Sequence, residues 1–593
     1  MIPSTINTLV LALGVTLSGA TSIPAGKPIK PNHESSKENA YRIFNAIHSA
    51  GRQWGSSYYH NGFGFIPAVM PRGTLLFHGD QNNTVPTGPE WLAFEIEHAE
   101  GFAFSHKGRF RRPPRIKPPG GDPRDPNRPP LPGDDPNDPP PPLVGDSDGQ
   151  TLLSDSEDTR QELRRRRNIQ GPGSGPLDSD DDDDKNVRGY LQTYQANRDL
   201  KLLYIDGMSA GKTSMGTLDT QDLLLRENTT NHNGRGFDEY PRAMDLCDLA
   251  GDWGFDGVMR MEAGFEIIYC DFNNGLDVIS MTRTAMPEDK VGDNSMAGFM
   301  WARAVGERYN GLGADRIRFD FSSMVSALFF PVNITSKEID RPDLVRLESV
   351  SLDDLRVIKK HLAKVAAEPR RFTVNWQGVV DLIVSRFAHR IGSMASESLA
   401  YRYFLYEVET ITATWFDAPP LPEDISLSTR ADVDRYADAV DRCRKHFLRP
   451  ATISKQDWSL EDELIFTSID TVMEKVCSTL FSIRELLSSA SPKPTASPDD
   501  DEAIENDDDS GLQHAVDIGR TAIQRLTETL GWTTWMQAQP CPLDEVLFIA
   551  MWPFGNVEDH WNPGCRSIEG LSGRGNESYW RMNFGGPRGG PKN

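Results

Sequence analysis

The chain has 593 residues, of which 38% are hydrophobic and 25% are charged, and its formal net charge is −23. Much of the excess negative charge lies in two acidic runs, residues 178–184 and 499–509, which stand among Ser, Pro and Gly and are typical of solvated linkers. The rest of the chain is only mildly acidic, so the composition argues against nucleic acid as a partner.

The N-terminus has the pattern of a secretory signal. Residues 9–17 form an apolar core, and Ala20-Thr-Ser22 offers small residues for cleavage, so we predict that residues 1–22 are a signal peptide and that the mature protein is extracellular. No later stretch approaches the ~18 apolar residues of a membrane span, so no span is expected. Four Asn-x-Ser/Thr sequons agree with a secreted glycoprotein. They are at Asn82, Asn228, Asn333 and Asn576.

A Pro-rich segment, residues 111–188, divides the N-terminal half of the chain. Such a segment buries too little apolar surface to offset its ordering entropy, so we predict a disordered insertion. The flanking blocks, residues 38–110 and 189–335, each lack a sufficient core alone, and we expect them to complete one α/β domain. Within the insertion, Arg164-Arg-Arg-Arg167 is either a candidate dibasic processing site or a solvated charge run.

Beyond residue 335 the pattern becomes helical. Residues 336–487 are predicted to form a mostly α-helical domain, with helix-start signals at Ser351 and Ser459. Residues 488–511 are expected to be an acidic disordered linker, and residues 512–593 a C-terminal helix and a Cys- and aromatic-rich tail. The predicted fold class is therefore α+β.

Hydrophobic periodicity predicts individual elements along the chain. In chain order these are a helix over 40–50, a strand over 200–206, a helix over 240–251, two strand-like runs within 257–271 that split at Ala263-Gly264, and helices over 352–365, 464–486 and 513–535.

The six cysteines are even in number, as an oxidising compartment favours. Six cysteines allow 15 pairings, and we predict that sequence neighbours pair, because each neighbouring pair lies within one compositional block. The predicted disulfides are Cys247–Cys270, Cys443–Cys477 and Cys541–Cys565. No spacing is C-x-x-C, so a cysteine zinc site is not expected.

One loop carries two candidate motifs. Gly207-Met-Ser209-Ala-Gly211 follows a predicted strand and matches G-x-S-x-G, the turn that lifts a nucleophilic serine clear of the sheet in α/β-hydrolases. Ser209 is therefore a candidate nucleophile, and an ordinary turn is the alternative. The same loop ends in Gly211-Lys212-Thr213 like a phosphate-binding loop, but Asp206 stands where its first Gly belongs.

Two distant strand-like segments carry polar residues that suggest a cleft. One ends at His78 and is followed by Trp91 and Phe94, and the other carries Glu266. This ordered His, aromatic, Glu pattern resembles ADP-ribosyltransferase-like folds. The resemblance implies NAD as cofactor, with His78 holding a ribose and Trp91 or Phe94 stacking on nicotinamide. Glu266 would stabilise the oxocarbenium-like ribose, which makes His78 and Glu266 the implied catalytic residues.

Other interpretations of these residues remain open. His78 is alternatively a strand-end histidine bonded to backbone, and Glu266 is alternatively paired with Arg260 across a sheet. Glu262 competes with Glu266 for the acid position. The two carboxylates could also serve a glycosidase, but on a regular strand they lie ~13 Å apart, beyond the separations that glycosidases use, unless a bend at Gly264 intervenes.

The whole chain also resembles a group of predicted secreted fungal proteins that carry no assigned activity, through the segments 203–212, 257–271, 551–555 and 558–560. Glu558-Asp-His560 offers three metal ligands, but adjacent loop residues rarely face one ion, so a surface loop and no metal site are expected.

The resulting hypothesis is a secreted fungal glycoprotein whose activity the sequence leaves open. The enzyme interpretation is an ADP-ribosyltransferase-like protein using NAD. The alternatives are a non-catalytic secreted protein that binds an extracellular or host protein, and a serine hydrolase using Ser209.

Overall fold

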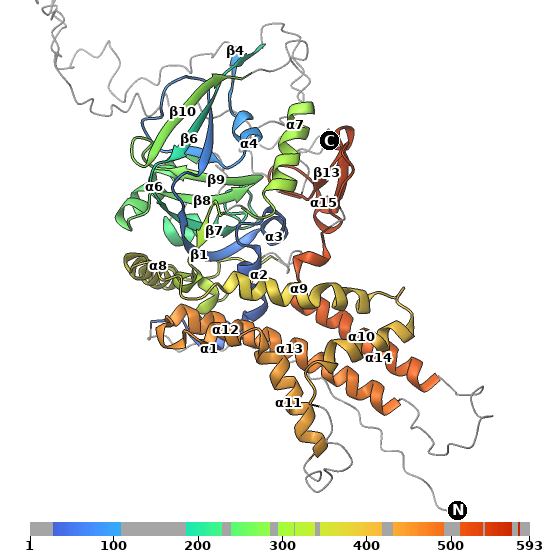
Figure 1. Ribbon diagram of the computed structural model, residues 1–593. Helices are drawn as coiled ribbons and strands as arrows, with labels where there is room; N and C mark the ends of the chain where they lie inside the picture. Colours follow the sequence, from blue (N-terminus) through green and yellow to red (C-terminus); the bar gives the residue numbers. More distant parts are fainter. Residues whose placement is uncertain are drawn as a thin grey trace, which may run out of the picture.

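The computed structural model describes residues 28–107, 185–227, 239–284, 295–312, 315–337, 344–417, 431–490, 510–537, 540–571 and 579–580. It contains an α/β unit built on one large sheet, followed by a mostly helical region, so the fold is α+β as predicted (Figure 1). The predicted signal peptide, the Arg164–Arg167 cluster, most of the predicted insertion and linker, and the sequons at Asn228 and Asn576 lie outside the described residues.

The described part of the α/β unit contains a ten-stranded sheet with the order β10-β6-β2-β3-β9-β8-β7-β1-β11, in which β12 also pairs with β1. Its strands are β1 (Asn61–Met70), β2 (Leu75–Asp80), β3 (Glu90–Ala93), β6 (Tyr190–Ala196), β7 (Leu200–Gly207), β8 (Gly257–Glu262), β9 (Gly264–Tyr269), β10 (Leu276–Arg283), β11 (Arg318–Phe319) and β12 (Val325–Ser326). A separate pair joins β4 (Phe104–Lys107) to β5 (Lys185–Arg188).

Strands from before and after the predicted insertion share this sheet. Phe65 of β1 pairs with Ile205 of β7, and His78 of β2 pairs with Gln192 of β6. The two N-terminal blocks therefore complete each other, as the sequence suggested. The bend at residue 263 is a hairpin, because Glu262 pairs with Gly264.

One face of the sheet packs against the connection between β7 and β8, which are parallel. The connection contains the π-helix η1 (Thr220–Leu225) and the helix α6 (Glu239–Asp252). The buried apolar side chains of α6 recur with helical spacing, at Ala243, Leu246, Cys247 and Ala250, so one stripe faces the strands. The Cys247–Cys270 disulfide fastens α6 to the end of β9.

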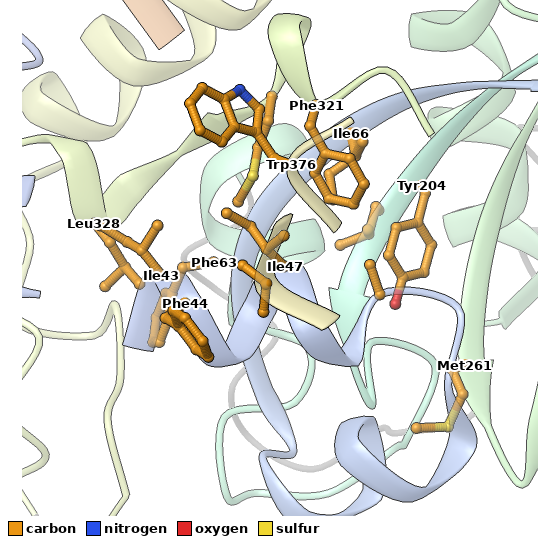
Figure 2. Packing of buried hydrophobic residues seen from close by; sticks show 14 of the residues in the cluster. Ile43, Phe44, Ile47, Phe63, Ile66, Tyr204, Met261, Phe321, Leu328 and Trp376 are labelled. Atoms are coloured by element: carbon orange, nitrogen blue, oxygen red, sulfur yellow. The ribbon is translucent and has the colours of Figure 1, made fainter. Parts of the chain in front are cut away.

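The opposite face packs against α2 (Ala40–Ser49) and α3 (Gln53–Tyr58), which follow α1 (His33–Glu38). Ile43, Phe44 and Ile47 of α2 lie beside Ile66 and Tyr204 of the sheet and close to Trp376 of the helical region, so the two parts share one core (Figure 2). The short helix α4 (Ile96–Glu100) lies beyond β3.

The helical region centres on its longest described helix, α13 (Leu460–Ala490), and Cys443–Cys477 joins α11 to it. The Ser459 hydroxyl accepts from the Asp462 amide at 3.0 Å, and the Asp462 carboxylate accepts from the Ser459 amide, which completes the predicted cap. The other helices here are α8 (Leu352–Ala367), α9 (Trp376–Ala395), α10 (Tyr401–Ala413), α11 (Ala431–His446), α12 (Arg449–Thr452) and α14 (Ser510–Leu530). The helix α7 (Ser295–Arg303) and the π-helix η3 (Ala304–Arg308) that follows it belong to the α/β unit.

The C-terminal tail returns to the α/β unit beside α3 and α7 (Figure 1). It consists of β13 (Glu545–Phe548), α15 (Val557–Trp561), β14 (Gly564–Ser567) and α16 (Ile568–Leu571), and Cys541–Cys565 closes it. All three predicted disulfides are therefore confirmed. Within the described residues, no helix combines the length and apolar character that crossing a bilayer requires.

Candidate active site

The residues predicted for an NAD site lie on neighbouring strands but on different faces of the sheet. His78 is on β2, Trp91 is on β3 and Glu266 is on β9, and these strands are adjacent. Phe77 pairs with Ala93, and Ala93 pairs with Glu266. Paired residues share a face and successive residues alternate. Glu266 and Trp91 therefore project to one face, and His78 projects to the other.

The His78 ring is engaged on its own face. Its Nδ1 lies 2.8 Å from the Trp91 carbonyl oxygen, and its centroid lies 5.7 Å from that of Phe272. Phe94 is buried just beyond β3, where its amide donates to the Tyr309 hydroxyl at 3.1 Å. The structure does not bring His78 and Glu266 into one cleft, and the NAD site stays a prediction from the sequence.

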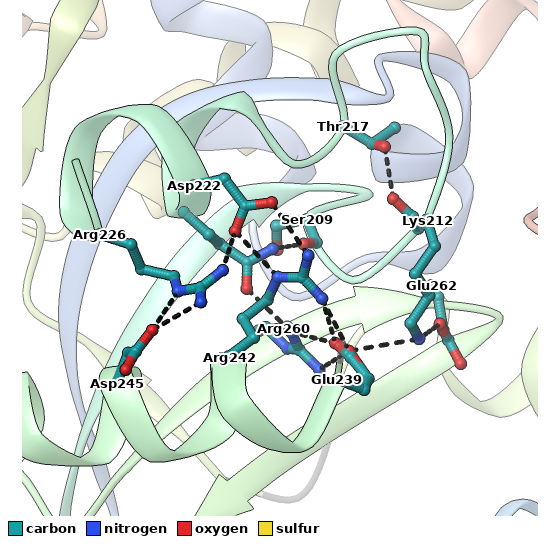
Figure 3. Close-up of polar contacts among 12 residues, drawn as sticks. Ser209, Lys212, Thr217, Asp222, Arg226, Glu239, Arg242, Asp245, Arg260 and Glu262 are labelled. Carbon is teal, nitrogen blue, oxygen red and sulfur yellow. Dashed lines mark hydrogen bonds and ion pairs between the residues drawn. The ribbon is translucent and has the colours of Figure 1, made fainter. Parts of the chain in front are cut away.

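Glu266 pairs with Arg260, and Arg260 belongs to a cluster of charged side chains between the sheet and α6 (Figure 3). Arg260, which is completely buried, forms ion pairs with Glu266 and, at 3.0 Å, with Glu239. Arg242 then links Glu239, at 3.2 Å, to Asp222, at 2.9 Å. Each charge has opposite charges beside it, which offsets the several kcal/mol that desolvating an ion costs.

Two further charged residues, Lys212 and Glu262, extend this cluster to the carboxyl ends of β7 and β8. The loop after β7 carries Lys212, and β8 ends at Glu262. The Ala210 amide donates to the Met261 carbonyl at 2.8 Å, which holds the loop beside β8. In α/β sheets, ligands bind where loops leave the carboxyl ends of neighbouring parallel strands.

Lys212 bridges two carboxylates at this edge. Its Nζ lies 2.5 Å from Glu262 Oε2 and 3.8 Å from Glu239 Oε2. The two carboxylate oxygens can therefore be no farther apart than the sum of these distances. The exposed fractions of the Lys212, Glu262 and Glu239 side chains are 10%, 12% and 17%, so the group is largely dry but not sealed from solvent.

The two carboxylates have opposite electrostatic environments. Burial, reinforced by Glu266 and Glu239, raises the pKa of Glu262 to about 7 despite the neighbouring Lys212 ammonium. Burial also opposes ionisation of Glu239, but Arg260, Lys212 and other cations outweigh it and hold the pKa of Glu239 well below its usual range. Burial disfavours the charged form of Lys212, but the carboxylates prevail, so its pKa is raised and the amine stays protonated.

The C-terminal tail covers this group. The Trp552 ring centroid lies 4.7 Å from Lys212 Nζ, and the Trp552 amide donates to the Met208 sulfur at 3.4 Å. Trp552 is 7% exposed, and its indole Nε1 has no hydrogen-bond partner within the described residues. A π-helical turn forms the other wall, where the Gln221 Oε1 accepts from Arg260 at 2.8 Å. Such turns are frequent at functional sites.

Ser209 lies in the same loop but takes part in its packing. The residue is 1% exposed, and its hydroxyl donates to the Ile205 carbonyl at 2.9 Å. In the described part of the chain, no histidine hydrogen-bonds to that hydroxyl. A serine hydrolase needs a base within hydrogen-bond reach of its nucleophile, so this geometry does not favour Ser209.

Sequence patterns did not identify the Lys212, Glu239 and Glu262 group as a unit. Lys212 is noticeable only through a weak phosphate-loop match, and Glu262 only as a competitor of Glu266. Glu239 stands in no motif. A lysine after one strand and a glutamate at the end of the next are the signals that the sequence does contain, and both become informative once β7 and β8 are known to be parallel neighbours.

Within the described residues, no group of three or more His, Cys, Asp or Glu side chains is arranged to hold a metal ion. Asp559 instead forms a capping box with Asn556 at the start of α15 and pairs with Arg566 at 3.1 Å. The Glu558–His560 segment is thus part of a short helix and its cap, rather than a loop.

Comparison with known proteins finds a family model and two yeast proteins that are similar to this chain. Residues 33–295 match the family model described as the YPL277C N-terminal domain. The chain is 26% identical over 620 residues to the uncharacterized protein YOR389W of Saccharomyces cerevisiae, covering 92% of this chain and 86% of that protein. It is also 31% identical over 271 residues to the uncharacterized protein YPL277C of the same yeast, covering 43% of this chain and 45% of that protein. No solved structure matches the chain. The chain is thus similar to uncharacterised fungal proteins, and the similarity to the family model is limited to residues 33–295.

Proposed function

We propose that the chain is a glycoside hydrolase that retains anomeric configuration, with Glu239 as nucleophile and Glu262 as general acid and base. The observation that carries this proposal is a pair of carboxylates on one lysine ammonium whose pKa values are driven apart, to about 7 for Glu262 and downward for Glu239. Paired carboxylates with separated pKa values are how glycosidases divide the acid and nucleophile roles.

The spacing favours retention over inversion. The contacts of 2.5 Å and 3.8 Å to Lys212 Nζ limit how far Glu262 Oε2 can lie from Glu239 Oε2. Their sum stays below the ~6.5–9.5 Å that inverting enzymes need to admit a water, and it accommodates the ~5–5.5 Å of retaining enzymes.

The chemistry then proceeds in two balanced steps. Ionised Glu239 attacks the anomeric carbon while the bond to the leaving oxygen breaks and Glu262 donates its proton to that oxygen. In the second step, Glu262 takes a proton from water, the resulting hydroxide attacks the anomeric carbon, and the ester bond to Glu239 breaks. Lys212 stays protonated and orients both carboxylates.

A protonated acid at this position supports an O-glycoside rather than NAD as substrate. Nicotinamide leaves NAD as a neutral base and needs no proton, whereas a sugar alkoxide is a poor leaving group until it is protonated. A carboxyl group whose pKa is about 7 retains a proton for this purpose near neutral pH.

The test compares Glu262→Gln and Glu239→Gln with the wild-type chain on nitrophenyl and alkyl glycosides. Glu239→Gln should abolish turnover of both kinds. Glu262→Gln should lower kcat/KM, which reports the first step, about 10²–10⁴-fold on alkyl glycosides but much less on nitrophenyl glycosides, because nitrophenolate departs without a proton. Glu407→Gln, in an ion pair with Arg390 between α9 and α10, is the matched control. Equal losses of kcat/KM on both substrate kinds, or turnover that survives Glu239→Gln, would exclude these roles.

We also propose that the protein is exported as a glycoprotein. Three disulfides and sequons at Asn82 and Asn333, both in loops of the described structure, support this. Expressed in a fungal host, the chain should appear in the medium, shortened by about 20–25 residues and carrying N-glycans. Purely intracellular recovery with Met1 intact would contradict the proposal.

A further inference from the structure

We propose that the C-terminal tail completes the candidate active site through Trp552, a positioning residue whose indole ring holds the Lys212 ammonium between Glu239 and Glu262 and keeps water away from Glu262. This inference rests on the proposed function, and it deepens it by naming an element that regulates the site. Trp552 lies outside residues 33–295, which the family model matches, whereas the two carboxylates and the lysine lie within them.

The Lys212 ammonium is contacted by two carboxylates and by one aromatic ring. Its Nζ lies 2.5 Å from Glu262 Oε2 and 3.8 Å from Glu239 Oε2, and the centroid of the Trp552 ring lies 4.7 Å away. An ammonium group this close to an indole is attracted to the ring face, and the attraction is strongest where water is excluded. Because the lysine stem is flexible, the ring helps to fix the ammonium on both carboxylates.

Trp552 is itself held by the loop after β7 and by a turn in the tail. Its amide donates to the Met208 sulfur at 3.4 Å, and a Cβ added to Gly211 would lie 3.3 Å from the Trp552 Cβ, so the two segments pack closely. Met551 and Phe554 exchange backbone hydrogen bonds at 3.0 Å and 2.6 Å, which closes a turn around Trp552. The position of the ring is therefore set before a substrate binds.

Glu262 faces charges from several elements. Lys212, on the loop after β7, lowers the pKa of Glu262, whereas Glu266 on β9 and Glu239 on α6 raise it. Arg260 on β8 forms ion pairs with these same two carboxylates. Burial is the largest cause of the shift and raises the pKa of Glu262 to about 7. The protonation of Glu262 therefore depends mainly on how well the site excludes water.

Removal of the Trp552 ring should admit water to the site. Trp552 is 7% exposed and the Glu262 side chain is 12% exposed, and a gap lined by an ammonium and carboxylates is polar enough to hold water. Hydration favours the charged carboxylate, so the pKa of Glu262 should fall toward its ordinary value, and the general acid would lose its proton near neutral pH. A looser Lys212 acts in the opposite direction, but burial is the larger cause.

The test measures kcat/KM against pH, on an alkyl glycoside that the wild-type chain cleaves, for the full-length wild type, Trp552→Ala and Trp552→Phe. The wild-type kcat/KM should decline above about pH 7, as Glu262 loses its proton. Trp552→Ala should move this decline down by about one pH unit or more. Trp552→Phe keeps a ring over the ammonium and loses no hydrogen bond, because the indole Nε1 has no partner within the described residues, so the decline should stay in place.

A second readout needs no substrate. In the full-length protein labelled with ¹³C at the glutamate side-chain carboxyls, the NMR resonance that is missing from Glu262→Gln reports Glu262 directly. It should titrate near pH 7 in the wild type and at lower pH in Trp552→Ala. Trp552→Leu, whose side chain is also smaller and has no ring face, should shift the titration in the same direction if Trp552→Ala does not fold. Trp415→Ala, at an indole of the helical region that is also 7% exposed, is the matched control and should leave the titration unchanged.

The outcomes separate this inference from the proposed function. A lower titration of Glu262 in Trp552→Ala, without hydrolysis by the wild-type chain, would keep the positioning role and remove the glycosidase. Hydrolysis with the same pH profile and the same Glu262 titration in wild type and Trp552→Ala would keep the glycosidase and overturn the positioning role. An equal shift in Trp552→Phe or in Trp415→Ala would also overturn it, because the effect would not depend on the ring over Lys212.

Discussion

Asp206 offers a quantitative test of the buried electrostatics, because its carboxylate is 5% exposed at the end of β7. It accepts a hydrogen bond from the Gly64 amide at 2.7 Å. Burial raises the pKa of Asp206 from 3.8 to about 7, and backbone amides, including that of Gly64, offset only part of the shift. The perturbation is Asp206→Asn, which keeps an acceptor for Gly64 and removes the titration.

The sign follows from linkage. Between pH 3.8 and about 7 the unfolded chain releases the Asp206 proton while the folded chain keeps it, so the free energy of unfolding falls as pH rises through this window. Below pH 3.8 this contribution is fully present, and above about pH 7 it is lost. At about 1.4 kcal/mol per pKa unit, the total loss is of order 4 kcal/mol.

The assay is urea unfolding of the wild-type chain and Asp206→Asn at pH values from 4 to 8. The free energy of unfolding of the variant, relative to wild type, should rise by about 4 kcal/mol across this range. The slope is the readout, because Asp206→Asn also introduces an amide donor, whose effect shifts all values by a constant. Asp353→Asn, at a side chain that is 93% exposed, makes the same charge change and should show no such slope. A constant difference between wild type and Asp206→Asn at every pH would refute the assigned shift.

Three further predictions concern stability. Arg260→Met should lower the free energy of unfolding in urea by about 3–5 kcal/mol, because Glu266 and Glu239 lose their buried partner. Arg318→Met removes an exposed ion pair and should leave the urea midpoint unchanged. Replacing Cys247 and Cys270 together by Ala removes a disulfide between residues 23 apart in sequence. The free energy of unfolding should fall by roughly 3 kcal/mol, and the urea midpoint should fall with it. An unchanged midpoint would show that the disulfide does not constrain the unfolded chain. Gly306→Ala should lower the free energy of unfolding by about 1–3 kcal/mol, because an added Cβ would lie 2.4 Å from the Leu547 carbonyl oxygen. A variant that is as thermally stable as the wild-type chain would contradict that close packing.

Local signals predicted much of the fold. The helix expected over 240–251 is α6, the strand over 200–206 is β7, and the hairpin at residue 263 joins β8 to β9, because hydrophobic periodicity and glycine positions act over a few residues. The helix expected over 464–486 extends further in both directions, to Leu460–Ala490, because the acidic first turn and the cap at Ser459 continue it.

The candidate site could not be predicted in the same way. Lys212, Glu239 and Glu262 are distant in sequence, and no motif links them. They meet because β7 and β8 are parallel neighbours joined by η1 and α6, and because a tail residue, Trp552, returns over Lys212. The pKa of Glu262 likewise depends on its burial, which follows from the tertiary fold and cannot be predicted from the local sequence.

The sequence by itself determined the identity and approximate limits of the main elements and the disulfide pairing, since periodicity, capping and cysteine neighbourhood are local properties. Tertiary structure decided which polar side chains meet. Strand register sends His78 and Glu266 to opposite faces of one sheet, and it places Arg260 and Glu262 on the face where Glu239 of α6 meets them. A shift by one residue in that register would reverse every such assignment, and long-range pairing, which sets the register, is invisible to local pattern.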